Sequence, residues 1–237
     1  MNDLAKPADL ERDSEVGVGN TGESWTILRM ILWSAEYLKN KGVETGRLDA
    51  EWLLAAALGV DRLQLYLKYD RPLSSEEREA FKPLLRRRAG REPLQYIIGR
   101  TGFRQLELKT DPRVLIPRPE TEVLVQEVLD WAAARRGSLG RVWDMGTGTG
   151  AVALSLAAEG ACTRVVATDV SPKALSVAAD NAERHDLGGL VEFREGPLFE
   201  PLEEDERFDI IVSNPPYIAE SERAGLQPEV RDWEPPE

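Results

Sequence analysis

From residue 141 onward the chain alternates short β-branched runs with segments of helical periodicity, and this alternation constrains the fold more than any other feature. A glycine-rich turn follows the first run, and Ser171-Pro172 is a typical helix start after the second. Strands are expected over residues 142–145, 165–168, 191–193 and 208–213. Strands that alternate with helices form right-handed crossovers in a parallel sheet. We therefore predict an α/β, Rossmann-like fold for this part.

The first half of the chain is helical in pattern. Ser74 with Glu77 three residues later predicts a capping box, and Asp61 is expected to cap a short helix. Tyr96-Ile97-Ile98 and the glycines that follow read as short strands. The expected division is a flexible tail (1–22), a small all-α bundle (23–92), a β-hairpin linker (93–117) and a catalytic domain (118–237).

The composition excludes several classes of protein. At 237 residues with 42% hydrophobic content, the chain can bury a core, and wholesale disorder is excluded. It has no apolar run of membrane-spanning length, and residues 1–22 lack the basic start and apolar middle expected of a signal peptide. One His and one Cys leave no usual zinc site, and the lone Cys162 fits a reducing cytoplasm. Residues 96–237 carry 15 Lys and Arg against 26 Asp and Glu, which disfavours a nucleic-acid partner.

A glycine-rich segment, Asp144–Gly150, lies where the first strand gives way to a helix. Glycines allow a sharp turn and close approach of a ligand to the helix N-terminus. Asp169, at the end of the next strand, is placed to bind two ribose hydroxyls. The pattern alone leaves NAD and S-adenosylmethionine about equally favoured, with a purely structural turn as a third interpretation.

Asn214-Pro215-Pro216-Tyr217 separates these alternatives. It follows a buried-looking strand whose end is expected to open onto the same crevice. The Asn214 side-chain oxygen and the Pro215 carbonyl offer two acceptors to an NH₂ group, and Tyr217 offers a flat face for stacking. This motif favours methyl transfer to a planar nitrogen, either an amide or the exocyclic amine of a base. It leaves a dehydrogenase reading without support.

The sequence resembles the protein-(glutamine-N5) methyltransferases of the PrmC/HemK family over nearly everything from Trp25 to Glu237. The resemblance rests on Glu92–Gly99, Ile116–Glu122, the Asp144–Gly150 loop and Asn214–Tyr217. It implies a class I S-adenosylmethionine-dependent methyltransferase that modifies the glutamine of the Gly-Gly-Gln motif in peptide chain release factors. It also implies that the helical domain recognises that protein substrate.

The resemblance also implies roles for individual residues. Catalysis and amide binding fall to Asn214, Pro215, Pro216 and Tyr217. Arg118 and Glu122 are expected to support the site. S-adenosylmethionine is expected to contact Asp144, Gly146, Thr147, Gly148, Thr149, Gly150, Asp169, Val170, Leu198 and Asn214. No metal is expected, and we predict a cytoplasmic monomer.

Two departures from the family pattern affect these expectations. Pro197 stands where the family commonly has an acid that bonds the adenine amine, so we expect either a lower cofactor affinity or substitution by Leu198 and a backbone carbonyl. The chain also ends 20 residues after Tyr217, before further strands of the family fold, so we expect an incomplete sheet and weak or no activity. The alternatives are an amino-methyltransferase acting on nucleic-acid bases and an inactive cofactor-binding module.

Overall fold

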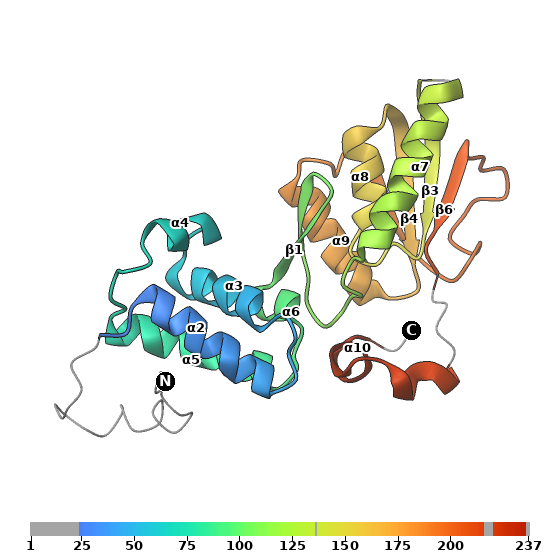
Figure 1. The fold of residues 1–237 in the computed structure, drawn as a ribbon. Helices are drawn as coiled ribbons and strands as arrows, with labels where there is room; N and C mark the ends of the chain where they lie inside the picture. The colour runs from blue at the N-terminus through green and yellow to red at the C-terminus, as the bar shows by residue number, and fades with distance from the viewer. Residues whose placement is uncertain (1–23, 136, 216–219, 236–237) are drawn as a thin grey trace. The chain divides into compact units, whose positions relative to one another are not determined.

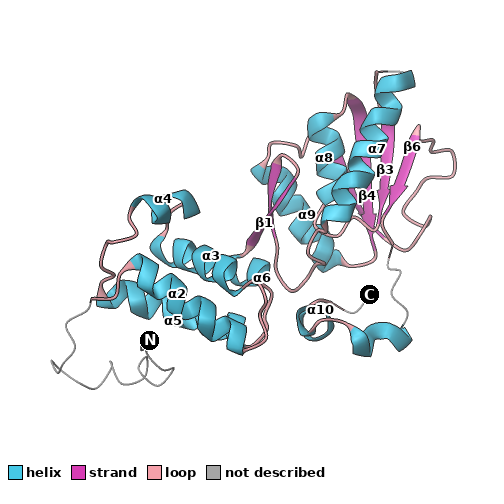
Figure 2. Cartoon of the chain, viewed as in Figure 1, coloured by secondary structure: helices cyan, strands magenta, loops and turns pink. Residues whose placement is uncertain are grey.

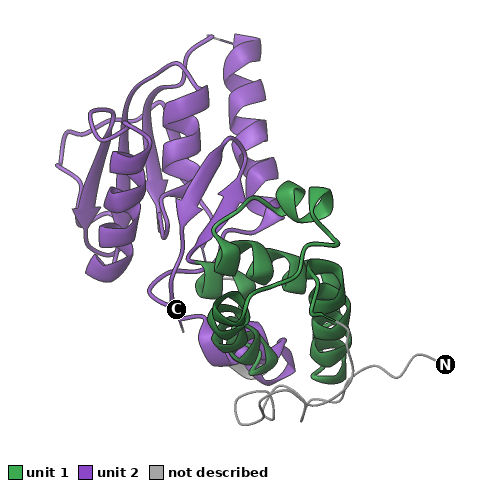
Figure 3. Cartoon of the chain, turned by 90° about the vertical axis from the view of Figure 1, so that its left-hand side faces the viewer, with its two compact units in different colours: residues 1–98 green, residues 99–237 purple. Residues whose placement is uncertain are grey.

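The computed structural model describes residues 24–135, 137–215 and 220–235. The chain forms two compact units, Met1–Ile98 and Gly99–Glu237 (Figures 1 and 3). The first unit is all helical in its described part, and the second combines a hairpin, a parallel sheet and helices (Figure 2). The unit boundary lies inside the segment expected to be a linker. The four-part division of the chain remains a prediction.

Five helices build the first unit over its described residues, 24–98. They are α2 (Ile27–Asn40), α3 (Gly46–Leu58), α4 (Arg62–Leu67), α5 (Ser75–Ala89) and α6 (Leu94–Ile98). Helix α3 contacts all the others and is closed at Gly59, whose left-handed φ of 63° suits glycine. The expected capping box is present: Ser74 Oγ accepts from the Glu77 N–H, and the Glu77 carboxylate accepts from the Ser74 N–H.

Two local predictions for this unit are wrong. Residues 94–98 form helix α6 and not a strand, because Ile97 joins the apolar core between α3 and α5 while the Tyr96 and Ile97 N–H groups donate to the Pro93 carbonyl. A short apolar run does not distinguish the two conformations by its pattern. Asp61 occupies the N-cap of α4, but its side chain makes no capping hydrogen bond.

A four-stranded parallel sheet organises the second unit, in the order β5-β4-β3-β6. The expected parallel sheet is therefore confirmed. Its strands are β3 (Gly140–Met145), β4 (Cys162–Asp169), β5 (Val191–Glu195) and β6 (Ile210–Ser213). An antiparallel hairpin of β1 (Arg100–Phe103) and β2 (Leu106–Lys109) precedes it. The helical elements are α7 (Pro119–Arg135), α8 (Ala151–Glu159), α9 (Pro172–Arg184), the 3₁₀ helix η1 (Glu220–Gly225) and α10 (Pro228–Trp233).

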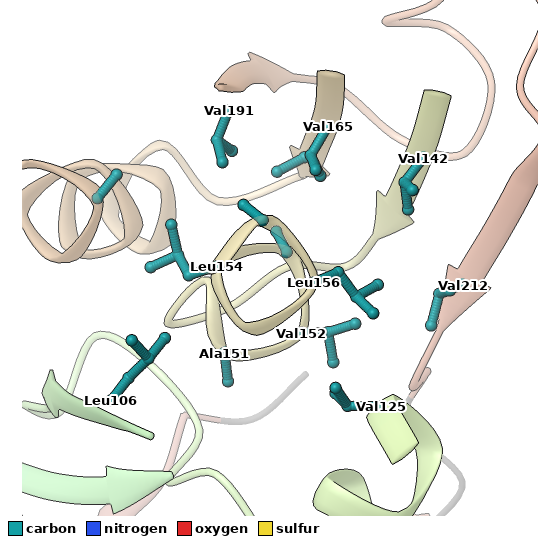
Figure 4. Close-up of a cluster of buried hydrophobic side chains, with 14 of the residues drawn as sticks. Leu106, Val125, Val142, Ala151, Val152, Leu154, Leu156, Val165, Val191 and Val212 are labelled. Atoms are coloured by element: carbon teal, nitrogen blue, oxygen red, sulfur yellow. The ribbon is translucent and has the colours of Figure 1, made fainter. Parts of the chain in front are cut away.

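Helix α8 is the centre of the core of this unit. It contacts β3, β4 and β5 on one side and α7 on the other, and α9 packs on β4 and β5. Figure 4 shows Leu154 and Leu156 of α8 among valines of the strands, with Val125 of α7 beside Val152. Every residue of α8 from Ala151 to Ala157 is buried, which explains its uninterrupted run of apolar and small residues.

The indole of Trp143 is fully buried between the sheet and the chain that precedes β6. Its ring lies 5.3 Å from that of Phe199 and 5.8 Å from that of Phe208, and its Nε1–H donates to Thr168 Oγ1 at 3.0 Å. At the edge strand β6, by contrast, Ile211 remains 59% exposed. The sheet is therefore covered unevenly.

Asn181 of α9 connects the hairpin to the glycine-rich loop. Its side chain is fully buried; Oδ1 accepts from the Lys109 N–H at 2.7 Å, and Nδ2 donates to the Lys109 carbonyl at 3.2 Å and the Thr149 carbonyl at 3.0 Å. Both N–H donors of the amide and one lone pair of its oxygen thus have a partner. The amide holds β2 and the loop against one helix.

None of the helices within the described ranges has the length and apolar character needed to cross a membrane.

Candidate active site

The expected site residues follow three neighbouring strands at one edge of the sheet. Met145, the last residue of β3, pairs with Thr168 of β4 on one side and with Ser213 of β6 on the other. The glycine loop, Asp169 and Asn214 come directly after these residues. The carboxyl edge of a parallel sheet is where ligands bind in open α/β folds. The structure therefore brings together the segments that the sequence singled out.

The glycine loop turns tightly and leaves part of its backbone open. The Gly146 and Thr147 N–H groups both donate to the Thr168 carbonyl at 2.9 Å. Gly146 and Gly148 have φ of 78° and 55°, and a Cβ placed on either would meet nothing within 4 Å. Open space beside a left-handed glycine is what close approach of a ligand requires. These two positions fit the expected cofactor contact.

Gly150 has a different role. Its φ is 83°, and an added Cβ would lie 3.0 Å from Leu154 Cδ1 and 3.3 Å from Ala178 Cβ. Glycine is required here because the start of α8 packs closely on α9. Thr147 and Thr149 are also buried, so little of either residue is exposed to a ligand.

Asp144 is a buried acid that organises the loop. Its Oδ2 accepts from Thr147 Oγ1 at 2.7 Å and from the Ala153 N–H at 3.1 Å. Burial raises the pKa of Asp144 to about 6, against the effect of these two hydrogen bonds, and the nearby Asp169 charge raises it further. The carboxylate faces the loop and the start of α8. Asp144 therefore fixes the conformation of the glycine loop relative to the start of α8.

Asp169 lies at the same edge with both carboxylate oxygens in use. Oδ2 accepts from the Gly148 N–H at 2.9 Å and Oδ1 from the Ser171 N–H at 2.9 Å. Val170 is 66% exposed and Leu198 is 65% exposed, and Leu198 has a left-handed φ of 48°. Large apolar side chains this exposed are available to a planar ligand. Their contact with adenine stays a prediction.

Asn214 is exposed at the end of β6, and one end of its amide is held. Its Nδ2 donates to Thr121 Oγ1 at 3.2 Å, while the preceding Ser213 Oγ donates to the Met145 carbonyl at 2.9 Å. Pro215 is exposed beside it. The expected contributions of Pro216 and Tyr217 lie outside the described residues.

Thr121 is a site residue that the sequence reasoning missed, although it stands within the Ile116–Glu122 motif. Two of the three charged residues of that motif make structural contacts. Arg118 Nη2 pairs with Glu234 Oε1 at 2.5 Å, and Glu122 Oε1 accepts from the Arg104 N–H at 3.2 Å. Asn181, which holds the Thr149 carbonyl, was also missed. Nothing in their local sequence indicates these long-range partners.

Among the residues that the structure describes, no group of three or more His, Cys, Asp or Glu side chains is arranged to hold a metal ion. His185 caps the far end of α9, where its Nε2 lies 2.9 Å from the Glu107 carbonyl. The residues gathered at the sheet edge are therefore hydrogen-bonding and apolar groups. Such a set suits binding and orientation of a ligand.

Comparison with known proteins identifies two families along the chain. Residues 29–99 match the PrmC N-terminal domain, and residues 120–227 match the methyltransferase small domain. The second match spans the glycine loop, Asp169 and Asn214. It therefore covers every part of the site except the first residues of the Ile116–Glu122 motif.

Curated relatives match over most of the chain. The release factor glutamine methyltransferase of Geobacter sulfurreducens is 50% identical over 213 residues, which cover 90% of this chain and 72% of the relative. That of Rhodopirellula baltica is 41% identical, covering 89% and 72%. The solved N-terminal domain of human METTL16 in complex with SAH is 25% identical with a TM-score of 0.41, over 49% of this chain and 48% of that one.

These matches confirm the resemblance inferred from the motifs, the class I methyltransferase fold and the dependence on S-adenosylmethionine. They do not favour the nucleic-acid or dehydrogenase alternatives. The chain belongs to the release factor glutamine methyltransferase family.

Proposed function

We propose that this protein transfers a methyl group from S-adenosylmethionine to the side-chain nitrogen of the Gly-Gly-Gln glutamine in peptide chain release factors. The observation that carries the proposal is the juxtaposition of Asn214 with the open glycine loop and Asp169 at one sheet edge. The 50% identity to a release factor glutamine methyltransferase supports the choice of substrate.

The residues present fit the cofactor. Open backbone at Gly146 and Gly148 would admit the methionine moiety and ribose, and the Asp169 carboxylate would accept from the ribose hydroxyls. Exposed Val170 and Leu198 would border the adenine. When bound, S-adenosylmethionine supplies an electrophilic methyl group on its sulfonium.

Asn214 and Pro215 would orient the substrate amide. An amide nitrogen is a weak nucleophile because its lone pair is delocalised into the carbonyl. Two acceptors, Asn214 Oδ1 and the Pro215 carbonyl, would hold the NH₂ group and favour the positive charge that develops on nitrogen. The proton leaves after transfer, so the mechanism requires no general base.

We further propose that the protein works as a cytoplasmic monomer on a protein substrate, with residues 23–92 recognising that substrate and no direct nucleic-acid contact. The acidity of residues 96–237 supports a protein partner over a phosphate backbone.

The test is labelled methyl transfer to a release factor and to its Gln→Ala variant, with the Geobacter sulfurreducens relative as positive control. We expect label on the wild-type factor alone. Label on both factors would rule out glutamine as the acceptor. Label on an oligonucleotide, with strongly salt-dependent binding, would favour the nucleic-acid alternative.

A further inference from the structure

Thr121 and Asn214 come from different elements and meet at the carboxyl edge of the sheet. Thr121 is the third residue of α7 and is 8% exposed, whereas Asn214 is exposed just after β6. Asn214 Nδ2 donates to Thr121 Oγ1 at 3.2 Å. We propose that Thr121 is a positioning residue that fixes the place and orientation of the Asn214 amide. This inference rests on the proposed role of Asn214 in binding the substrate amide.

The orientation of an asparagine amide decides what it can bind. One end, Oδ1, accepts hydrogen bonds, and the other, Nδ2, only donates. The nitrogen of a glutamine side chain also donates, so it needs the oxygen of Asn214. With Nδ2 bonded to Thr121, the oxygen remains for the substrate. If the Asn214 amide were rotated by half a turn, its NH₂ group would face the NH₂ group of the substrate, and neither could accept a hydrogen bond.

Both ends of this hydrogen bond are fixed by packed structure. The Thr121 N–H donates to the Arg118 carbonyl at 3.0 Å, and α7 packs against α8. On the other side, β6 pairs with β3, and Ser213 Oγ donates to the Met145 carbonyl. A β-branched threonine also has few side-chain rotamers in a helix. The hydroxyl is therefore held in place before any substrate arrives.

The experiment compares Thr121→Val, which keeps the shape and removes the hydroxyl, with Thr121→Ser, which keeps the hydroxyl. The matched control is Thr163→Val, at the exposed amino end of β4 far from the site edge. One readout is the ¹⁵N-edited side-chain amide signal of Asn214, assigned by its loss in Asn214→Asp. The other is the kcat and KM of methyl transfer to the release factor.

We expect Thr121→Val to move the Asn214 amide signal and lower kcat about tenfold, the value of one hydrogen bond. KM and the Kd for S-adenosylmethionine should change less than about twofold. Thr121→Ser should restore the signal and most of kcat, and Thr163→Val should match the wild type.

An unchanged Asn214 amide signal in Thr121→Val would overturn the inference. An equal loss of kcat in the valine and serine variants would also overturn it, because it would show that Thr121 acts through packing alone. The two proposals fail separately. If the wild-type chain labels no release factor, the proposed function fails, and the amide signal still decides whether Thr121 fixes Asn214.

Discussion

The backbone N–H of Gly148 donates a hydrogen bond of 2.9 Å to Oδ2 of Asp169. The residue proposed to bind the ribose therefore also holds the glycine loop open at the position where a ligand would enter. The other oxygen of Asp169 accepts from the Ser171 N–H, which begins α9. Each carboxylate oxygen retains a second acceptor site for a ligand hydroxyl.

Replacing Asp169 by Asn should raise the Kd for S-adenosylmethionine about tenfold or more. The substitution exchanges one carboxylate oxygen for an NH₂ group, which cannot accept, so either the contact with the loop or the contact with the ribose is lost. Isothermal titration calorimetry measures the Kd. The control is Ser171→Ala, which removes the side-chain cap of α9 and should cost about 1 kcal/mol of stability with affinity unchanged. Wild-type affinity in Asp169→Asn would contradict the assignment.

Replacing Asn214 by Ala should lower the rate of methyl transfer at least about a hundredfold and change the cofactor Kd less than about twofold. The amide would lose an acceptor that orients it. The control Thr163→Val, at the exposed amino end of β4, should retain full activity. If Asn214→Ala loses cofactor binding and transfer equally, the division of roles is wrong.

The buried acid Asp144 should make stability fall with rising pH. Its pKa is about 6 in the folded protein against an ordinary value of 3.8, so the folded state binds the proton more tightly. Its contribution to the free energy of unfolding should decrease as pH rises from about 4 to 6, by about 2–3 kcal/mol, and level off above.

Asp144→Asn should remove this dependence because asparagine does not titrate. The fold should be retained, since the amide oxygen can still accept from Thr147 and Ala153. Urea unfolding between pH 4 and pH 7 measures the pH dependence, with the exposed Asp205→Asn as control. Parallel pH profiles for the wild type and Asp144→Asn would disprove the effect.

Glu206 should have the opposite pH dependence. It accepts from Arg194 at 2.7 Å and from Arg141 at 2.6 Å, and these partners, Arg194 foremost, lower its pKa to about 2 from an ordinary value of 4.5. Its stabilisation is present above about pH 4.5 and is lost as pH falls toward 2. Glu206→Gln should cost about 1–2 kcal/mol at pH 7, and little near pH 2.

The matched control for Glu206 is Glu204→Gln, two residues earlier and exposed. Chemical unfolding at pH 7 and at low pH distinguishes the two. Equal stability of the Glu204 and Glu206 variants at pH 7 would show that the arginine contacts contribute nothing.

Replacing Pro197 by Asp should tighten S-adenosylmethionine binding about three- to tenfold. Pro197 is exposed after β5 and has no side-chain acceptor for the adenine amine, and a carboxylate there would supply one. Pro197→Ala controls for loss of the ring. If the alanine and aspartate variants bind alike, the position does not contact adenine.

Local signals made much of the fold predictable. The Ser74–Glu77 capping box and the Ser171-Pro172 helix start act within four residues, and both are present. The strand ends were predictable for a different reason. Parallel strands share one carboxyl edge, so Asp169 and Asn214 had to approach the glycine loop once the alternation of strands and helices was recognised.

Features that depend on distant packing could not be predicted. Residues 94–98 fold as a helix because α3 and α5 provide an apolar surface for Ile97, which the local run does not encode. The bond between Thr121 and Asn214 joins residues 93 positions apart. Its existence depends on how α7 lies along the sheet.

The buried amide of Asn181 binds both the hairpin and the glycine loop, and so links the two. Lifting β2 from α9 would break both bonds between that amide and Lys109, at a cost of about 1–3 kcal/mol, and would leave the bond to the Thr149 carbonyl as the amide's remaining contact. One side chain of α9 thus sets the position of both the hairpin and the glycine loop, and a displaced hairpin would leave the Asn181 amide with fewer contacts to fix its orientation toward the loop.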